Sequence, residues 1–507
     1  GGRGGVRRLL LTAERKDITV DGNGQIRVAQ FEDVDVTVSG TLNAGTTSGS
    51  ALLGSESDLT VGLVSAADEV RIKTGASLFG VAGQTHVVAD SAVLEAGAGQ
   101  IGTAATPFAV DLGATGTLTA RAGTDLFVHE VNGDMVIDTV FARGDATLQA
   151  QGSIVESVED SRLDVSGTNV TLTAGDTIGR PGGQNALDVQ VRDPGVLSAG
   201  APTGIYLSAS GLSGKLGDIT TQGEFQFAVV DGSVTLAGTV QANAGVAIGA
   251  ADDIRFEGGR VRTDGNAELN AGTDGTGNIT RTGGTGPEVQ AGNEVRLNAP
   301  DAIGSTEALR VVAGSPLSLQ GRLMNVSLSP LLPNAATVVN VTGLGGGTAQ
   351  DVTLNVSGAS DLRLNTFVVG NARVVSDAPT LSVPAGFVGD AATFVTPFFT
   401  TRVDRQDRAP APDGTTIRGF TFNGDFILNL TPTEAFLNQY LINYDLRRLV
   451  YGTPPGSAEL TIGAGLRSTS ASSPEEAFPI GNRAGAGDAA PAPELISINL
   501  DGLDDDL

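Results

Sequence analysis

The sequence contains no cysteine and no tryptophan, and aromatic residues make up only 4% of it. Without cysteine the chain can have neither a disulfide framework nor thiol chemistry, although this absence does not fix the cellular compartment. Globular cores usually take much of their volume from aromatic side chains, so we expect thin layers of Val, Leu, Ile and Ala instead. Hydrophobic residues, at 40%, are too frequent for wholesale disorder.

Positive charge is also scarce. The chain has 31 Lys and Arg residues against 57 Asp and Glu residues, which gives a net charge of −26, and only Lys16, Lys73 and Lys215 are lysines. Affinity for phosphate groups is built from Lys and Arg, so this composition argues against a nucleic-acid partner. An acidic surface keeps an exported protein soluble and attracts divalent cations.

Long apolar runs are missing as well. No segment approaches the roughly 18 apolar residues of a transmembrane helix, which argues against a membrane span. The first residues, GGRGGVRRLLLTAE, have too short an apolar part for a signal peptide, and Gly1 stands where an initiator Met would. We therefore interpret the sequence as a processed product whose original start lies upstream.

A ten-residue pattern recurs along the chain, with a clear copy, VTLTAGDTIG, at residues 170–179. The copies are centred on Leu94, Leu118, Leu148, Leu172, Leu269 and Leu297. The spacing is similar between each of the first four leucines and the next, and again between the last two, which suggests one coil of a repeat fold per copy. We therefore expect the first four leucines to form a single inward-facing column.

A second apolar element follows four of the copies. These elements are Phe108-Ala109-Val110, Leu163-Asp164-Val165, Leu187-Asp188-Val189 and Leu309-Arg310-Val311. Each begins after a connection from the preceding Ile whose length is not constant along the chain. Constant flanks around a variable connection are typical of a coil with one permissive corner.

Within each copy apolar residues alternate with Thr, Ser, Asn, Gln or Glu, the pattern of a strand with one buried face. Gly and Asn supply the positive φ angles of tight corners. We predict an all-β fold, a parallel β-solenoid of some 12 to 15 coils, which at about 4.8 Å per coil makes a rod of roughly 60–70 Å. A string of small antiparallel sandwiches is the alternative.

The segments LTAGDTIG, LEAGAGQIGTAATPFAV and LNAPDAIGSTEALRV resemble the repeats of filamentous haemagglutinin and related large exoproteins of two-partner secretion. The resemblance covers roughly residues 12 to 330. It implies a right-handed parallel β-helix on a bacterial surface, exported through an outer-membrane barrel partner and commonly acting in adhesion. The N-terminal secretion domain and the Asn-rich signatures of that family are not found in this sequence.

The C-terminal part has a different composition. We predict a repeat rod over residues 1–402, with weaker repeats after 330, and a cap or association segment over residues 403–480. A helix is expected near residues 432–451, where Thr431 and Glu434 form a capping box. It either covers the open end of the rod or forms a subunit contact.

Residues 481–507 are predicted to be a Gly/Ala/Pro tether followed by a terminal β-strand. We hypothesise that this strand adds to an exposed sheet edge of its own or of a neighbouring chain; a frayed acidic terminus is the alternative. The residues assigned to self-association in this hypothesis are Phe436, Tyr440 and Tyr444 of the helix and Ile496, Ile498 and Leu500 of the strand.

Signals of catalysis are weak. Arg71-Ile72-Lys73, Asp252-Asp253 and Thr263-Asp264-Gly265 are similar to fragments of polygalacturonases, but their order differs and no Gly-His-Gly is present. We expect the two histidines, His86 and His129, at solvated or edge positions, one or two coils apart, with no triad or metal arrangement. No cofactor is predicted. The corner aspartates Asp176, Asp252 and Asp253 are read as a solvated face, with weak surface Ca²⁺ binding as the alternative.

These observations favour a non-enzymatic extracellular protein with a structural or adhesive role. We predict a rod on a bacterial surface that self-associates into a fibre or surface layer through its ends or its C-terminal strand. The expected partners are a second copy of the chain, an outer-membrane secretion barrel, and a surface glycan or receptor. The alternatives are a β-helical polysaccharide lyase or hydrolase and a monomeric glycan-binding adhesin.

Overall fold

The computed structural model describes residues 41–159, 161–182, 185–378, 380–382 and 391–396. Outside these ranges it describes nine strands: β1 (Arg8–Leu11), β2 (Ile18–Val20), β3 (Ile26–Val28), β4 (Val34–Thr37), β43 (Phe399–Arg405), β44 (Thr415–Ile417), β45 (Phe420–Phe422), β46 (Phe426–Pro432) and β47 (Leu460–Ile462).

The chain divides into two compact units, Gly1–Asp264 and Gly265–Leu507. The fold is an all-β parallel solenoid of about 16 turns, slightly more than the sequence predicts. No α-helix occurs in the described residues, and so none is long and apolar enough to cross a membrane.

In unit 1 the remaining strands are short and follow one another at brief intervals. They are β5 (Thr41–Gly45), β6 (Ala51–Ser55), β7 (Leu59–Ser65), β8 (Glu69–Thr74), β9 (Leu78–Gly80), β10 (Val87–Ala89), β11 (Ser91–Ala96), β12 (Phe108–Leu112), β13 (Leu118–Ala122), β14 (Leu126–Glu130), β15 (Met135–Ala142), β16 (Ala146–Ala150), β17 (Ile154–Glu156), β18 (Val165–Gly167), β19 (Val170–Ala174), β20 (Thr177–Ile178), β21 (Leu187–Val191), β22 (Val196–Ala201), β23 (Gly204–Ala209), β24 (Lys215–Thr221), β25 (Glu224–Val229), β26 (Val234–Leu236), β27 (Thr239–Ala242), β28 (Gly245–Ala250), β29 (Ile254–Glu257) and β30 (Arg260–Thr263).

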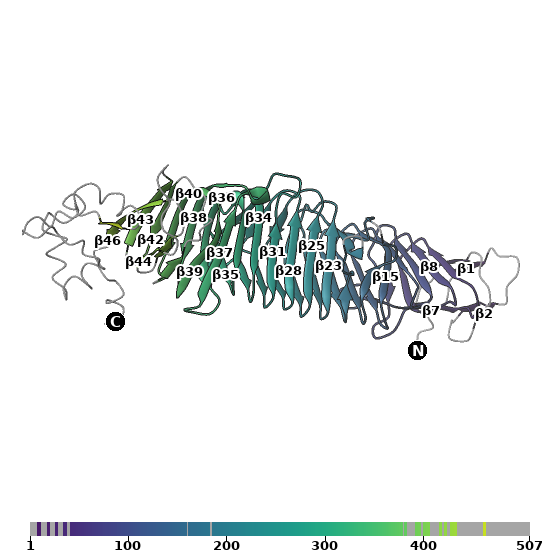
Figure 1. The fold of residues 1–507 in the computed structure, drawn as a ribbon. Coiled ribbons are helices and arrows are strands. Elements are labelled where there is room, and N and C mark those ends of the chain that lie inside the picture. Colours follow the sequence, from purple (N-terminus) through teal and green to yellow (C-terminus); the bar gives the residue numbers. More distant parts are fainter. Residues whose placement is uncertain are drawn as a thin grey trace, which may run out of the picture. The chain divides into compact units, whose positions relative to one another are not determined.

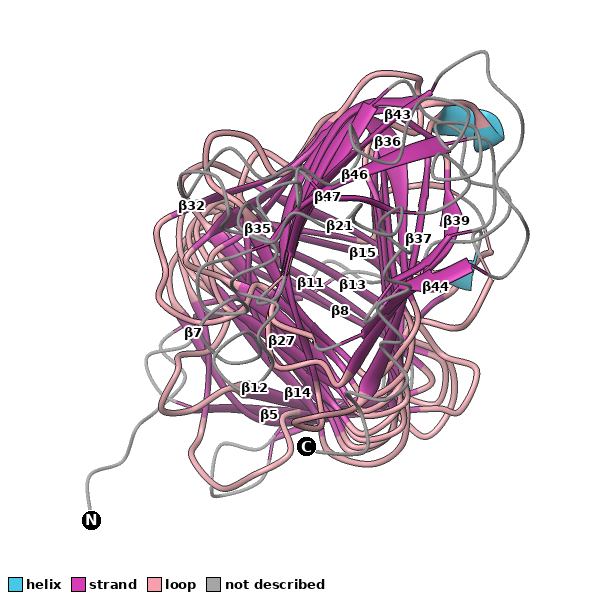
Figure 2. Cartoon of the chain, turned by 60° about the vertical axis from the view of Figure 1, so that its left-hand side comes forward, coloured by secondary structure: helices cyan, strands magenta, loops and turns pink. Residues whose placement is uncertain are grey.

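These strands pair with strands of the next coil in parallel register and so form ladders. One ladder contains β8, β11, β13, β15, β18 and β21 in this order, and all of them except β18 are labelled in Figure 2. A second contains β12, β14, β16, β19 and β22, and a third contains β23, β25 and β28, which lie side by side in Figure 1. Parallel pairing excludes the alternative of small antiparallel sandwiches.

In unit 2 the strands are longer, and one 3₁₀ turn is present, η2 (Leu344–Gly346). The strands are β31 (Asn266–Asn270), β32 (Asn278–Thr282), β33 (Val289–Ala291), β34 (Val295–Ile303), β35 (Leu309–Ala313), β36 (Leu317–Pro330), β37 (Ala336–Thr342), β38 (Ala349–Val356), β39 (Asp361–Phe367), β40 (Val369–Ser376), β41 (Thr380–Ser382) and β42 (Ala391–Val395).

The core of unit 2 contains one continuous inward column. Successive register partners are Leu269, Leu297, Leu319, Val341 and Phe367, and each is at most 2% exposed. Every member covers the side chain of the coil before it, so an aliphatic column of this kind removes apolar surface from water on both sides of each layer. The pairing of Leu269 with Leu297 confirms that those two repeat copies are one coil apart.

The expected single column of four leucines in unit 1 is wrong. All four side chains are buried, but Leu94 pairs with Ala120 rather than with Leu118. Leu148 and Leu172 do stack directly, in the ladder of β16 and β19, to which Leu118 of β13 does not belong. The error has a physical cause: each face of the coil needs the same alternating pattern, so a copy can recur on another face after more or less than one full turn.

The paired elements around the variable corner are confirmed. Ile154 stacks on Ile178, and the second elements stack through Val165 and Val189. The glycine that follows Ile178, Gly179, has φ +67°, and a Cβ there would lie 2.0 Å from the carbonyl oxygen of Tyr206 in the next coil. The corner therefore requires glycine for its backbone conformation and for close coil stacking.

The first and last described strands pair in the opposite sense. In unit 1, β1 is antiparallel to β4, and β2 to β3. In unit 2, β43 is antiparallel to β42 and to β46, which in turn pairs with β47.

The predicted helix lies outside the described residues apart from Pro432, the last residue of β46. The six predicted self-association residues and the tail strand also lie outside them. The predicted domain boundaries at residues 402 and 480, and the right-handed sense of the coil, stay predictions.

Candidate functional site

The structure does not bring the predicted enzyme-like fragments together. On β8, Arg71 pairs with Glu69 at 3.0 Å and Lys73 with Glu95 at 3.1 Å. Asp253 precedes β29, which does not pair with β8, and its carboxylate lies 2.5 Å from Arg255. These charges are paired at separate places on the surface of unit 1.

Three buried carboxylates gather at one corner of unit 1, and sequence analysis did not select them. Glu156 at the end of β17 and Asp164 and Asp188 at the second elements are 3%, 5% and 8% exposed. One carboxylate oxygen from each lies within 4.8 Å of the other two. The sequence did contain a signal, because Leu-Asp-Val occurs at positions 163–165 and again at positions 187–189.

Hydrogen bonds hold this cluster between coils. The backbone N–H of Asp188 donates to Asp164 Oδ2 at 2.8 Å, and the hydroxyl of Ser208 donates to Asp188 Oδ1. Oxygen donors of this type suit hard cations such as Ca²⁺. Carboxylates this close can also share a proton or accept hydrogen bonds from nearby donors. Asp164 and Asp188 already accept such hydrogen bonds, so the proximity of the three carboxylates does not by itself indicate a metal site.

His86 is buried at 1% exposure, so its expected solvated position is wrong. Its Nε2 donates to the carbonyl of Val81 at 2.8 Å, and its Nδ1 accepts the N–H of Ala109 at 2.7 Å. The ring packs against Phe108, with centroids 4.9 Å apart. This arrangement requires the neutral ring, and burial lowers the pKa of His86. The imidazole thus fixes the backbone of the corner to the next coil.

A second group of titratable side chains lies two coils further on than His86. His129 pairs with Ala109, which itself faces His86, so the two histidines are two coils apart, as expected. The adjacent Glu130 is fully buried and accepts the N–H groups of Leu112 at 3.2 Å and Asn132 at 3.1 Å. Burial raises its pKa to about 8 against the opposing effect of these two donors.

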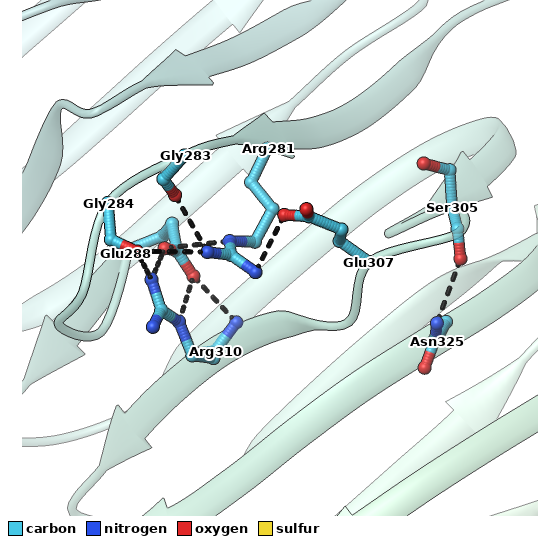
Figure 3. Close-up of polar contacts among 8 residues, drawn as sticks. All are labelled: Arg281, Gly283, Gly284, Glu288, Ser305, Glu307, Arg310 and Asn325. Carbon is cyan, nitrogen blue, oxygen red and sulfur yellow. Dashed lines mark hydrogen bonds and ion pairs between the residues drawn. The ribbon is translucent and has the colours of Figure 1, made fainter.

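Unit 2 contains a compact ionic network at the corner before β33, drawn in Figure 3. Glu288 is 3% exposed and accepts from Arg281 Nε at 3.0 Å, from Arg310 Nε at 3.2 Å and from the backbone N–H of Arg310 at 2.9 Å. Arg281 also pairs with Glu307 at 2.9 Å and donates to the carbonyl of Gly283 at 2.7 Å. The two guanidinium groups and the two carboxylates balance in charge, so the network stabilises the conformation of this corner. We refer to Arg281, Glu288, Glu307 and Arg310 as the corner lock.

A groove of about 400 Å³, whose lining surface is more apolar than polar, lies over β36, β38, β40 and β42 in unit 2. Its outward column is formed by the register partners Ser327, Asn355, Val375 and Val395. The remaining lining residues are Val356, Ser357, Ser376, Asp377 and Thr396. Hydroxyl, amide and carboxylate groups beside small apolar side chains suit a neutral polar ligand better than a charged one.

Comparison with known proteins finds no matching family model, no matching curated protein and no matching solved structure. The resemblance to filamentous haemagglutinin therefore remains a prediction, whereas the β-helical repeat architecture that it implies is present in the structure. Of the corner aspartates read as a solvated face, with weak surface Ca²⁺ binding as the alternative, Asp176 and Asp252 are exposed and Asp253 is ion-paired.

Proposed function

We propose that this chain is a non-enzymatic structural or adhesive protein of a bacterial surface. Its coils serve as a scaffold, and copies associate with one another through the end strands or the tail. The further partners in this proposal are the outer-membrane barrel implied by the family resemblance and a surface glycan or receptor. The repeat exists because each coil is stable only between others like it.

The observation that carries this proposal is the inward column of unit 2. From Leu269 to Phe367 five successive coils contribute one buried apolar side chain each, in register. In a repeat fold of this kind stability comes from contacts between neighbouring repeats rather than from one central core. Coils stacked in this way present a repeated outer face within unit 2, which is what a scaffold or an adhesive surface needs.

Negative-stain microscopy of the full chain, together with light scattering, tests the proposal. Fibres or sheets of regular width support self-association, and particles that stay single at all concentrations contradict it. Incubation with acidic polysaccharides, followed by the absorbance of unsaturated uronates, tests for a lyase. Turnover that is abolished by Asp253→Asn and retained by Asp176→Asn would overturn the non-enzymatic assignment.

The groove over β36 to β42 favours a second candidate, a monomeric glycan-binding adhesin. Ser327 and Asn355 of its lining supply hydrogen-bonding groups, and the neighbouring valines supply the apolar surface, that a neutral saccharide needs. A glycan array with the full chain tests this function. Binding should be weakened by Asn355→Ala and unchanged by Asn270→Ala, a substitution on β31 outside the groove.

A further inference from the structure

One outer face of unit 1 contains a cationic patch around a phenylalanine. Arg121 of β13 is the register partner of Phe141 of β15, and Arg143 follows two residues after Phe141, immediately beyond the end of the strand. Both arginines are exposed, and Arg121 Cζ lies 5.5 Å from the centroid of the Phe141 ring. We refer to these three residues as the Arg121–Phe141–Arg143 patch.

A third arginine fixes the ring from the other side. Arg192 donates through Nη2 to the carbonyls of Ala142 and Arg143, each at 2.7 Å, and through Nη1 to the hydroxyl of Ser166 at 2.9 Å. Its Cζ lies 5.6 Å from the Phe141 centroid. Arg192 is therefore committed to the fold and packs on Phe141, and its hydrogen bonds to the carbonyls of Ala142 and Arg143 fix the backbone of the patch.

The guanidinium groups of Arg121 and Arg143 are left for another partner. Within the described part of the chain neither forms an ion pair within 4.0 Å. The carboxylates closest to them in register are engaged elsewhere. Glu95 pairs with Lys73 at 3.1 Å, Asp138 accepts the hydroxyl of Thr119 at 2.9 Å, and Asp145 accepts the backbone N–H of Asn169 at 3.1 Å. The patch is thus locally cationic in a chain of net charge −26.

The spacing of the two arginines determines which ligands fit. Arg143 directly follows β15, and its backbone N–H donates to the carbonyl of Ala122 at 3.2 Å, so it lies diagonally across from Arg121 of β13. Diagonal positions of this kind are about 7–8 Å apart. Alternate residues of an extended peptide lie on one side of it and are about 6.7 Å apart. Two carboxylates two residues apart in an extended segment therefore match the two guanidinium groups, and arginine binds carboxylates in a bidentate manner.

This chain contains a segment with that pattern. Residues 501–507, DGLDDDL, include the sole run of three consecutive acidic residues in the sequence, and Asp504 and Asp506 are two residues apart. We infer that the Arg121–Phe141–Arg143 patch of one copy binds residues 501–507 of a second copy. This inference rests on the proposed self-association and names the surface and the segment that make the contact.

A labelled peptide of residues 494–507 tests the contact directly. The receptor is the full chain with Asp504, Asp505 and Asp506 each changed to Asn, so that its own acidic segment does not compete. We expect saturable binding that falls steeply as salt rises from about 50 to about 300 mM. Arg121→Gln combined with Arg143→Gln should weaken it about tenfold, since two exposed ion pairs are lost.

Arg262→Gln is the matched control, because Arg262 is an exposed arginine on β30 of the same unit. This substitution removes one exposed guanidinium group, against two in the test variant, and binding should change less than twofold. A charge exchange separates recognition from folding: a peptide with Asp504→Arg and Asp506→Arg should bind the chain that carries Arg121→Asp and Arg143→Asp. Equal loss in the Arg262→Gln chain, or no rescue, overturns the inference.

Two further outcomes keep this inference distinct from the proposed function. If wild-type fibres form and the Arg121→Gln and Arg143→Gln chain assembles equally well, the patch is not the contact, although self-association stands. If wild-type chains never assemble, the self-association on which the inference rests fails. A polyuronate that binds the patch while the peptide does not would replace the second copy with a glycan, and so would also overturn it.

Discussion

Glu130 is a buried carboxyl whose ionisation should destabilise the fold. Its side chain is fully buried between Val110 and Ala150, and its pKa rises from an ordinary value of 4.5 to about 8. The folded chain therefore keeps a proton that the unfolded chain has released. The stabilisation from this group is fully present below pH 4.5 and is lost as the pH rises through 8.

The size of the effect follows from the two pKa values. One pH unit between them corresponds to about 1.4 kcal/mol, so the interval from 4.5 to about 8 amounts to about 5 kcal/mol. About 3 kcal/mol of this is already lost at pH 7. Glu130→Gln removes the ionisable group and with it this dependence on pH. Because the amide offers a single oxygen to two N–H donors, it also shifts stability by an amount that does not depend on pH.

Urea-induced unfolding of the full chain from about pH 4.5 to about pH 9 measures the effect. The free energy of unfolding is compared between wild type, Glu130→Gln and Glu56→Gln, a change at an exposed carboxyl of the same unit. The difference between wild type and Glu130→Gln should move by about 3 kcal/mol between pH 4.5 and pH 7, while that for Glu56→Gln stays flat. A difference for Glu130→Gln that does not vary with pH would refute the reasoning.

Three further predictions concern the corners. Gly179→Ala should lower the free energy of unfolding by about 2 kcal/mol or more, because the backbone there has φ +67° and the added Cβ would meet the carbonyl of Tyr206. The control is Gly200→Ala, whose added Cβ meets nothing within 4 Å and which should change the free energy of unfolding by less than about 0.5 kcal/mol. Glu288→Ala should cost about 3 to 5 kcal/mol and speed proteolysis of its corner, since two arginines lose a buried partner; an unchanged thermal midpoint would contradict the lock. Because burial lowers the pKa of His86, its contribution is present above pH 6.5 and is lost as the pH falls through the folded-state value, a dependence that His86→Gln should lack in the same urea assay.

The repeat fold could be predicted because its signal is local. Alternation along each copy determines which side chains face inward, and glycines such as Gly179 mark the corners. The order of the coils could not be derived in the same way. Leu94 and Leu118 occupy neighbouring columns because coil length varies: Val128, Leu148, Leu172 and Ala199 are successive register partners, and the stretch of chain between one and the next lengthens at every coil. The spacing between two repeat copies in the sequence therefore does not determine whether their side chains lie in the same column.

The polar clusters were harder to foresee, since each is assembled from different coils. Asp164 and Asp188 had a visible signal in their repeated Leu-Asp-Val. Glu156 had no such signal in the sequence, because its position beside the two aspartates depends on how the corner folds. The strand pattern around His86 resembles that of a surface residue, and the ring is instead buried against Phe108 and bonded to the carbonyl of Val81.

Cysteine cross-linking tests the central claim, coil-on-coil stacking in register, most directly. The chain has no cysteine of its own, and Gln149 and Thr173 are exposed register partners on β16 and β19. Their Cα atoms should lie about 4.8 Å apart, within disulfide range, whereas Gln149 and Thr171 are about 8 Å apart. We predict that Gln149→Cys with Thr173→Cys forms an intramolecular disulfide on mild oxidation and that Gln149→Cys with Thr171→Cys does not. Cross-linking of the second pair alone, or of neither, would contradict the stacked solenoid.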